Sequence, residues 1–359
     1  MTMESEGTPA ADGTATEVGA VDEAEGLEKT VRGRRIRAPR ISTLLGQYGL
    51  LIAWAIVVLF FTLLPGTSQT FPTAGNFATI LGSQAVIVIL TLGLLVPLTA
   101  GDYDLSVGFT LTLAAMLVAV LNVQHHWPIV LAILVALGAG AMVGLVNGAF
   151  ILFFRIDSII VTLGTGTFAG GLVLLISGSN TISGVSANLV DWVIVNRLFG
   201  IPLEFYYGLL LCLVMWYVFE LTPLGRRLLF VGRGRNVARL SGINVNRVRL
   251  GALVTSGMVS AVAGVAYAGT TGAADPTSGT QLLLPAFAAA FLGATTIAPG
   301  RFNPVGCLVA VYFLVTGITG FQLLGAQSYV QSLFYGGALV IAVALSQIAR
   351  RRQALDTGG

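Results

Sequence analysis

The sequence predicts an all-α, polytopic membrane protein with about ten transmembrane helices, some of them broken or re-entrant. The first observation is composition: 55% of the 359 residues are hydrophobic and only 10% are charged, whereas soluble domains contain about 25% charged residues. A soluble protein of this size needs more charged side chains to cover its surface. The second observation is distribution, since eight of the 16 acidic residues precede residue 29.

The third observation is a series of apolar segments, each long enough to cross roughly 30 Å of hydrocarbon. We place ten spans at about 46–64, 77–98, 104–122, 127–153, 158–177, 204–221, 250–271, 282–298, 304–320 and 329–348. Pro285 and Pro299 weaken the eighth span, so the eighth and ninth are the candidates for a broken or re-entrant helix. Residues 1–40 are predicted to form a disordered cytoplasmic tail that ends in a basic stretch. The transmembrane domain follows at 41–349, and 350–359 form a second cytoplasmic tail.

The arginines predict the orientation of the spans. Short cytoplasmic loops collect Lys and Arg, and the loops after spans four, six, eight and ten contain Arg155, seven arginines between 226 and 249, Arg301 and Arg350–Arg352. The odd-numbered loops contain Arg197 alone. We therefore expect both termini in the cytoplasm. Topology also accounts for the net charge of +3, so no nucleic-acid partner is predicted.

The sequence argues against an enzyme. The only lysine, Lys29, follows Glu28 rather than the glycine of a nucleotide-binding G-x-x-x-x-G-K-[ST] loop. No base and nucleophile pattern is evident. The adjacent His125 and His126 have no cysteine or carboxylate near them in sequence, so we predict no metal site and no cofactor.

Two polar segments interrupt the apolar pattern. The first, PLTAGDYDLSVG at 97–108, contains Asp102, Asp104 and Ser106 after the proline that ends the second span. Acidic residues at bilayer depth cost about 2.5–3.5 kcal/mol and tend to be functional, which favours a part in the transport path or gate. The alternative role is structural. Asp104 is placed to cap the third span, where its carboxylate would accept hydrogen bonds from the first backbone N–H groups of that helix and meet the positive end of the helix dipole.

The second polar segment is the basic loop at 222–249, after span six. It contains GRGRNVARLSGINVNRVR, with the small residues Ala238, Ser241 and Gly242 among arginines. The simplest interpretation is a cytoplasmic anchor. About 27 residues is long for an anchor, however, and a short amphipathic segment suits docking into a groove of a partner protein.

These segments resemble the permease subunits of bacterial ABC importers for ribose and other monosaccharides. The family signature G-G-I-D-L-S-V-G is similar to GDYDLSVG at 101–108, although this chain has Asp102 and Tyr103 in place of Gly-Ile. The family's loop pattern G-x-N-x-x-A-A-x-x-S-G-I-N is similar to GRNVARLSGINVNRVRL at 234–250. The likeness continues in SGMVSAVAGVAYAG, IDSIIVTLGT and the last span, and covers about residues 45–350.

The resemblance implies a multi-pass permease of the bacterial plasma (inner) membrane that pairs as a homodimer and moves a sugar. It implies a cytoplasmic ATP-binding subunit and an extracytoplasmic sugar-binding protein as partners. The candidates for the translocation path or gate are Asp102, Asp104, Ser106, Thr162, Thr165, Phe168 and Gln322. The candidates for coupling to the ATPase are Arg235, Asn236, Ala238, Arg239, Ser241, Gly242 and Asn244. For each residue that is a candidate to line the path, ordinary helix packing is the alternative.

Two other functions stay open at this point. The same ATP-driven mechanism can carry a different cargo, such as a furanose signal, a nucleoside, a sugar alcohol or a branched-chain amino acid. An ion-coupled secondary transporter is less favoured, because it generally needs an ionisable residue near the bilayer midplane. Asp157, Glu204, Glu220 and Asp275 all fall at span ends.

Overall fold

The computed structural model describes residues 40–357, with side chains described from 47 to 347. The predicted disordered tail and basic stretch therefore lie outside the described residues, apart from the backbone of Arg40. The chain divides into two compact units, Met1–Leu44 and Leu45–Gly359. Within the first unit, only the start of helix α2 is described. The helical bundle belongs to the second unit.

Each of the ten predicted spans coincides with a helix or a helix pair, so the all-α membrane fold is confirmed. The helices are α2 (Arg40–Leu63), α3 (Ala74–Ser83), α4 (Ala85–Thr99), α5 (Val107–Ala119), α6 (Ile129–Phe153), α7 (Ser158–Ser177), α9 (Leu203–Leu221), α12 (Val245–Thr271), α13 (Ser278–Gly293), α14 (Pro304–Leu323) and α15 (Ser328–Thr357). Within the described residues, eight helical segments are long and apolar enough to cross a membrane. Two shorter apolar helices, Gln47–Leu63 and Ser278–Gly293, correspond to the first and eighth spans.

The irregular spans are only partly those that the prolines predict. Helix α13, the eighth span, has 16 residues, so it extends only about 24 Å at 1.5 Å per residue. The ninth span, α14, is a continuous helix of 20 residues. The second span is broken instead, because Gln84 separates α3 from α4 with a φ of −105° and a ψ of 0°.

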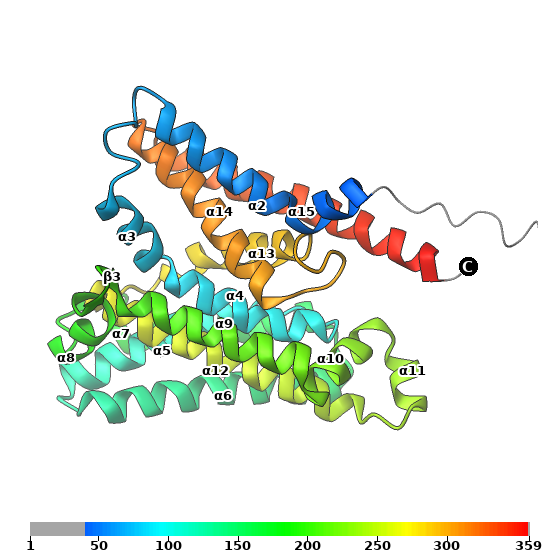
Figure 1. Cartoon of the computed structure of the whole chain (residues 1–359). Coiled ribbons are helices and arrows are strands. Elements are labelled where there is room, and N and C mark those ends of the chain that lie inside the picture. The colour runs from blue at the N-terminus through cyan, green and yellow to red at the C-terminus, as the bar shows by residue number, and fades with distance from the viewer. Residues whose placement is uncertain (1–39, 358–359) are drawn as a thin grey trace, which may run out of the picture. The chain divides into compact units, whose positions relative to one another are not determined.

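The centre of the bundle is formed by α4, α5 and α12 (Figure 1). Every residue of α4 is buried, because this helix is apolar on all sides and is surrounded by other helices. Helix α12 packs against α4, α5 and α6, and α13 packs against α14 and α15. Helices α6, α7 and α15 keep large apolar side chains on the outside, among them Leu175 (76% exposed) and Leu333 (70% exposed). Such faces suit contact with lipid or with another subunit.

The two ends of the bundle carry different short elements. At one end lie α8 (Ala187–Val190) and two small antiparallel pairs, β1 (Ile182–Ser183) with β4 (Ala273–Ala274) and β2 (Arg197–Leu198) with β3 (Ile201–Pro202). The opposite end carries α10 (Pro223–Arg233) and α11 (Arg235–Leu240), as Figure 1 shows. The loop rich in arginine is thus separated from the strands by the full length of α12.

Close contact between α6 and α12 depends on a pair of glycines. A Cβ atom at Gly257 would lie 2.2 Å from the carbonyl oxygen of Gly140, and one at Gly140 would lie 2.4 Å from the carbonyl oxygen of Gly257. Backbones can approach this closely only where no side chain separates them, and small residues are therefore common where membrane helices cross. This crossing fixes the middle of α12 against α6.

We predict that Gly257→Ala destabilises the protein by about 1–3 kcal/mol, because the added methyl group must displace α6. The control is Gly251→Ala on the same helix, where an added Cβ meets no atom within 4 Å. Thermal unfolding of the detergent-purified variants measures both effects. Equal melting temperatures for the two variants would contradict the packing argument.

Candidate functional site

The turn between α4 and α5 brings three of the predicted site residues together. Helix α4 ends at Thr99, and the carbonyl of Pro97 accepts the Asp102 N–H at 2.9 Å. Gly101 has a φ of 80°, a left-handed conformation that favours glycine. The chain therefore turns back sharply and buries Asp102, Asp104 and Ser106, each of which is 1% exposed.

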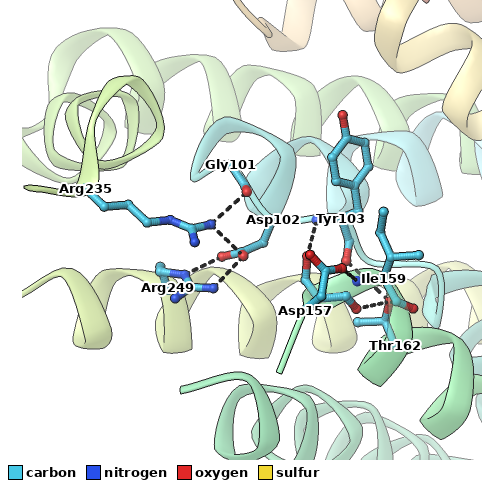
Figure 2. A network of polar contacts seen from close by, with 9 residues as sticks. Gly101, Asp102, Tyr103, Asp157, Ile159, Thr162, Arg235 and Arg249 are labelled. Carbon is cyan, nitrogen blue, oxygen red and sulfur yellow. Dashed lines mark hydrogen bonds and ion pairs between the residues drawn. The ribbon is translucent and has the colours of Figure 1, made fainter. Parts of the chain in front are cut away.

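Asp102 is held by two arginines from separate elements (Figure 2). The Arg249 guanidinium, on α12, donates to both carboxylate oxygens, with Nε–Oδ2 at 2.7 Å and Nη2–Oδ1 at 2.6 Å. Arg235, the first residue of α11, donates through Nη2 to Oδ1 at 2.9 Å and to the Gly101 carbonyl at 2.8 Å. We call Asp102, Arg235 and Arg249 the arginine clamp. The clamp ties the loop at 222–249 to the α4–α5 turn.

The two pairs in the clamp differ in their access to water. The side chains of Asp102 and Arg249 are 2% and 11% exposed, whereas that of Arg235 is 43% exposed. A bidentate pair away from water is the stronger of the two, because solvent screens the Arg235 charge. Asp102 is thus fixed to α12, while its link to α11 is easier to break.

Asp104 belongs to a separate chain of buried hydrogen bonds. Ser256, on α12, donates to Asp104 Oδ2 at 2.7 Å, and the Ser106 hydroxyl donates to Oδ1 at 2.5 Å. Asn147, on α6, donates to Ser106 Oγ at 2.9 Å, and Thr165, on α7, donates to Asn147 Oδ1. We call these five residues the polar chain. It joins the turn to three helices inside the bundle.

The predicted capping role of Asp104 has a structural counterpart. Its Oδ1 accepts the backbone N–H of Ser106 at 3.0 Å, one residue before α5 begins, so the carboxylate closes the turn rather than the first turn of the helix. Burial raises the pKa of Asp104 above its ordinary value, although the hydrogen bonds from Ser106 and Ser256 oppose this shift. The carboxyl group is therefore less easily ionised than one in water.

Helix α7 contacts the same turn through its first residues, as Figure 2 shows. The Tyr103 N–H donates to Ser158 Oγ at 3.1 Å, and the Leu105 N–H donates to Thr162 Oγ1 at 3.0 Å. Asp157 caps this helix by accepting the Ile159 N–H at 2.8 Å. Thr162 is fully buried, and its hydroxyl satisfies a backbone group of the turn.

The structure separates the predicted path residues into two groups. Asp102, Asp104, Ser106, Thr162 and Thr165 all belong to the arginine clamp, the polar chain or the contacts beside them. Phe168 is not part of this region, since it lies on the outer face of α7 and is 70% exposed. Gln322 lies near the far end of α14, where it lines a separate cavity.

The predicted coupling residues occupy α11 and the turn after it. Asn236, Arg239 and Ser241 are exposed, while Asn244 caps α12 by accepting the Arg247 N–H at 3.1 Å. Ala238 is fully buried in a small core with Val231 and Val245, so it packs α11 against the bundle rather than facing a partner. Gly242 is exposed and has a φ of 78°.

The exposed apolar side chains on α11 were not predicted from the sequence. Leu240 is 89% exposed and Val237 is 59% exposed, which is unusual for a helix at the polar end of a bundle. Arg249 was expected only as part of the basic loop, and Asn147 was not predicted as a site residue. A signal existed for Asn147, because an amide within an apolar helix requires a buried partner. Arg249 gave no such signal, since it lies among other arginines in the predicted loop.

We predict that Asp102→Asn destabilises the protein by about 3 kcal/mol, because Arg249 loses its partner in a nearly buried position. The double variant Asp102→Leu, Arg249→Met is expected to be more stable than Asp102→Asn, since it leaves no buried charge unpaired and the exposed guanidinium of Arg235 is solvated by water. Arg235→Gln is the control and is expected to change stability by less than about 1 kcal/mol. Unfolding in detergent provides the measurement, and equal effects of all three changes would contradict the assignment.

Comparisons with known proteins identify the family. The chain matches the family described as "Branched-chain amino acid transport system / permease component" over residues 76–343. The D-allose transport system permease protein AlsC of Escherichia coli (strain K12) is 29% identical over 302 residues, 84% of this chain and 92% of that protein. The ribose import permease protein RbsC of the same strain is 30% identical over 319 residues, 88% of this chain and 97% of that protein.

RbsC of Bacillus subtilis (strain 168) is 33% identical over 273 residues, 76% of this chain and 84% of that protein. No solved structure matches the chain significantly. The matched segment begins in α3, ends in α15 and includes both the arginine clamp and the polar chain. The chain therefore belongs to this family of transport-system permease components.

Proposed function

We propose that the chain is the membrane-spanning subunit of an ATP-driven ABC importer for a monosaccharide or a related polyol. It works with a cytoplasmic ATP-binding subunit and an extracytoplasmic sugar-binding protein, and two copies of the chain form the permease. Family membership supports the transport role. Relatives named for ribose and D-allose support the cargo class. The family description names branched-chain amino acids, but the relatives named for ribose and D-allose favour a sugar over this alternative cargo.

The observation that carries the proposal is the form of the loop at 222–249. Leu240 and Val237 place apolar surface on α11 next to exposed Arg239. A short helix with two exposed apolar residues and a basic rim suits a groove on a partner protein. The buried core of Val231, Ala238 and Val245 holds α11 in place. This segment is the proposed contact with the ATP-binding subunit.

The arginine clamp supports a route by which the partner acts on the permease. Arg235 stands at the first residue of α11, directly beside the proposed contact, and reaches Asp102 in the α4–α5 turn. The same turn contacts α7 through Ser158 and Thr162. Movement of α11 is therefore passed to a turn that belongs to the centre of the bundle. Binding protein and nucleotide must favour different states of the permease for such coupling to drive transport.

The proposed orientation is supported by the positions of the arginines. The even-numbered loops lie at one end of the bundle. Arg235 and Ser158, from the loops after spans six and four, both contact the α4–α5 turn. Arg301, from the loop after span eight, pairs with Glu220 at the end of α9. Arg197, in β2, lies at the other end. Loops rich in arginine collect on the cytoplasmic side. We therefore propose that the end carrying α11 faces the cytoplasm.

We predict that Leu240→Asp weakens co-purification of the ATP-binding subunit at least about tenfold and lowers ATP-dependent uptake, while leaving the amount of folded permease unchanged. The reason is that an exposed leucine contributes to a partner contact but little to the fold. The control is Leu198→Asp, an exposed leucine in β2 at the other end of the bundle. Wild-type co-purification of Leu240→Asp would contradict the docking assignment. Gly242 is a poorer probe, because any side chain there strains its left-handed backbone.

The transport function is tested in proteoliposomes that contain the permease and its ATP-binding subunit. Uptake of labelled D-ribose is expected only when ATP is present on the side of the ATP-binding subunit and the sugar-loaded binding protein is present on the opposite side. Uptake of a branched-chain amino acid under the same conditions would favour the alternative cargo. Accumulation driven by a pH gradient without ATP would contradict the mechanism.

A further inference from the structure

A cavity of roughly 270 Å³ lies in the half of the bundle away from α11. It is bounded by the junction of α3 and α4, the end of α12, and parts of α13, α14 and α15. Gln84, at the break between α3 and α4, is one of the residues that line it. Binding cavities for small molecules have volumes of a few hundred Å³ and combine apolar walls with a few polar groups. This cavity has both.

The polar groups in the cavity wall are free to bind a solute. The side chains of Thr319, Gln322 and Gln331 all line the cavity. None of the three donates or accepts a side-chain hydrogen bond among the described residues, and the same holds for the hydroxyl of Tyr335. Tyr335 is only 5% exposed, whereas Gln322 and Gln331 are exposed. Hydroxyl and amide groups both donate and accept hydrogen bonds, as sugar hydroxyls do.

Glu204 stabilises the wall of this cavity from behind. It is fully buried on α9, and one oxygen, Oε2, accepts a hydrogen bond from the Thr270 hydroxyl at 2.5 Å. Its other oxygen, Oε1, has no hydrogen-bond partner among the described residues. Thr270 lines the cavity, whereas Glu204 does not. From the sequence, Glu204 was expected at a span end, without a role in transport.

The contact with Glu204 determines what Thr270 offers to a solute. A hydroxyl has one proton and two acceptor positions, and the Thr270 hydroxyl lies within 2.5 Å of Glu204 Oε2 and 2.9 Å of the Ala266 carbonyl. Glu204 Oε2 is the closer of the two acceptors and takes the proton, so the lone pairs of the Thr270 oxygen remain to accept from the cavity side. Thr270 is therefore oriented as an acceptor for a solute hydroxyl.

The residues that line the cavity include no aspartate, glutamate, lysine, arginine or histidine. An amino acid carries an ammonium and a carboxylate group, and burying either without an opposite charge is costly. A neutral polyol needs only hydroxyl and amide partners together with apolar contacts for its C–H groups. The apolar part of the wall comes from side chains such as Val86, Leu282 and Ile318.

We infer that this cavity is a solute site for a neutral, polyhydroxylated molecule, and that Glu204 is a positioning residue that orients Thr270 within it. The inference rests on the proposed function, which it deepens by naming the site and by excluding a zwitterionic cargo. Thr319, Gln322, Gln331 and Tyr335 supply the other polar contacts. The site lies on the side from which the binding protein delivers its cargo.

The transport test compares D-ribose with 2-deoxy-D-ribose in the same proteoliposomes. The same binding protein delivers both sugars, so its own preference cancels when variants are compared. Thr319→Val and Gln322→Leu are each expected to change the ratio of the two uptake rates about two- to tenfold, the effect of one hydrogen bond. The control is Gln327→Leu, an exposed glutamine in the turn before α15 and outside the cavity. Wild-type ratios in both cavity variants would overturn the inference.

The role of Glu204 has its own pair of variants. Glu204→Gln keeps an oxygen that accepts from Thr270 and is expected to retain the wild-type ratio of the two uptake rates. Glu204→Leu is expected to shift this ratio in the same direction as Thr270→Val, because the Thr270 proton loses its closer acceptor. A purely structural role would lower the amount of folded protein without changing the ratio. Equal ratios in Glu204→Gln and Glu204→Leu would therefore overturn the positioning role.

A binding test separates failure of this inference from failure of the proposed function. The native Cys212 and Cys307 are buried, so a cysteine placed at Thr319 can be labelled with a maleimide in the purified permease. D-Ribose is expected to slow the labelling of Thr319→Cys but not of Gln327→Cys. If D-ribose protects Thr319→Cys from labelling but no ATP-dependent uptake is found, the result would support the solute site and contradict the proposed importer function. Uptake by the wild type, with neither protection nor altered ratios, would contradict the site alone.

Discussion

The bidentate pairing of Asp102 with Arg249 is the interaction on which the polar end of this bundle depends. An ionised carboxylate is stable inside an apolar bundle only with an opposite charge against it. Here the partner is on α12, the helix that also contacts α4, α5 and α6. The pair therefore fixes the α4–α5 turn to the centre of the protein. Arg235, which is more exposed, extends that connection to α11.

The same turn illustrates how two adjacent carboxylates take different roles. Asp102 faces two guanidinium groups, whereas Asp104 faces only hydroxyl and backbone donors. Burial raises the pKa of Asp104, because the hydrogen bonds from Ser106 and Ser256 only partly compensate for its removal from water. One carboxylate thus connects the turn to a cytoplasmic loop in our proposal, and the other organises the polar chain within the bundle.

The proposed contact with the ATP-binding subunit and the proposed solute cavity lie at opposite ends of α12. Its first residues contribute Arg249 and lie beside α11, and its last residues contribute Thr270 to the cavity. The crossing at Gly140 and Gly257 holds the middle of this helix against α6. In our proposal, α12 is a continuous helix of 27 residues that carries a displacement from one end to the other. Cargo contact and partner contact can therefore influence each other without sharing a residue.

The sequence alone determined the membrane class, the ten apolar spans and the grouping of the arginines, because these depend on composition and on local runs of residues. It also marked Asp102, Asp104 and the loop at 222–249 as unusual. Tertiary structure alone decided which residues meet: Arg249 with Asp102, Asn147 with Ser106, and Glu204 with Thr270. It also turned Ala238 inward and left Leu240 exposed. The reason is physical, since these contacts join residues 41 to 147 positions apart. Helix packing sets such distances, and no local pattern in the chain encodes them.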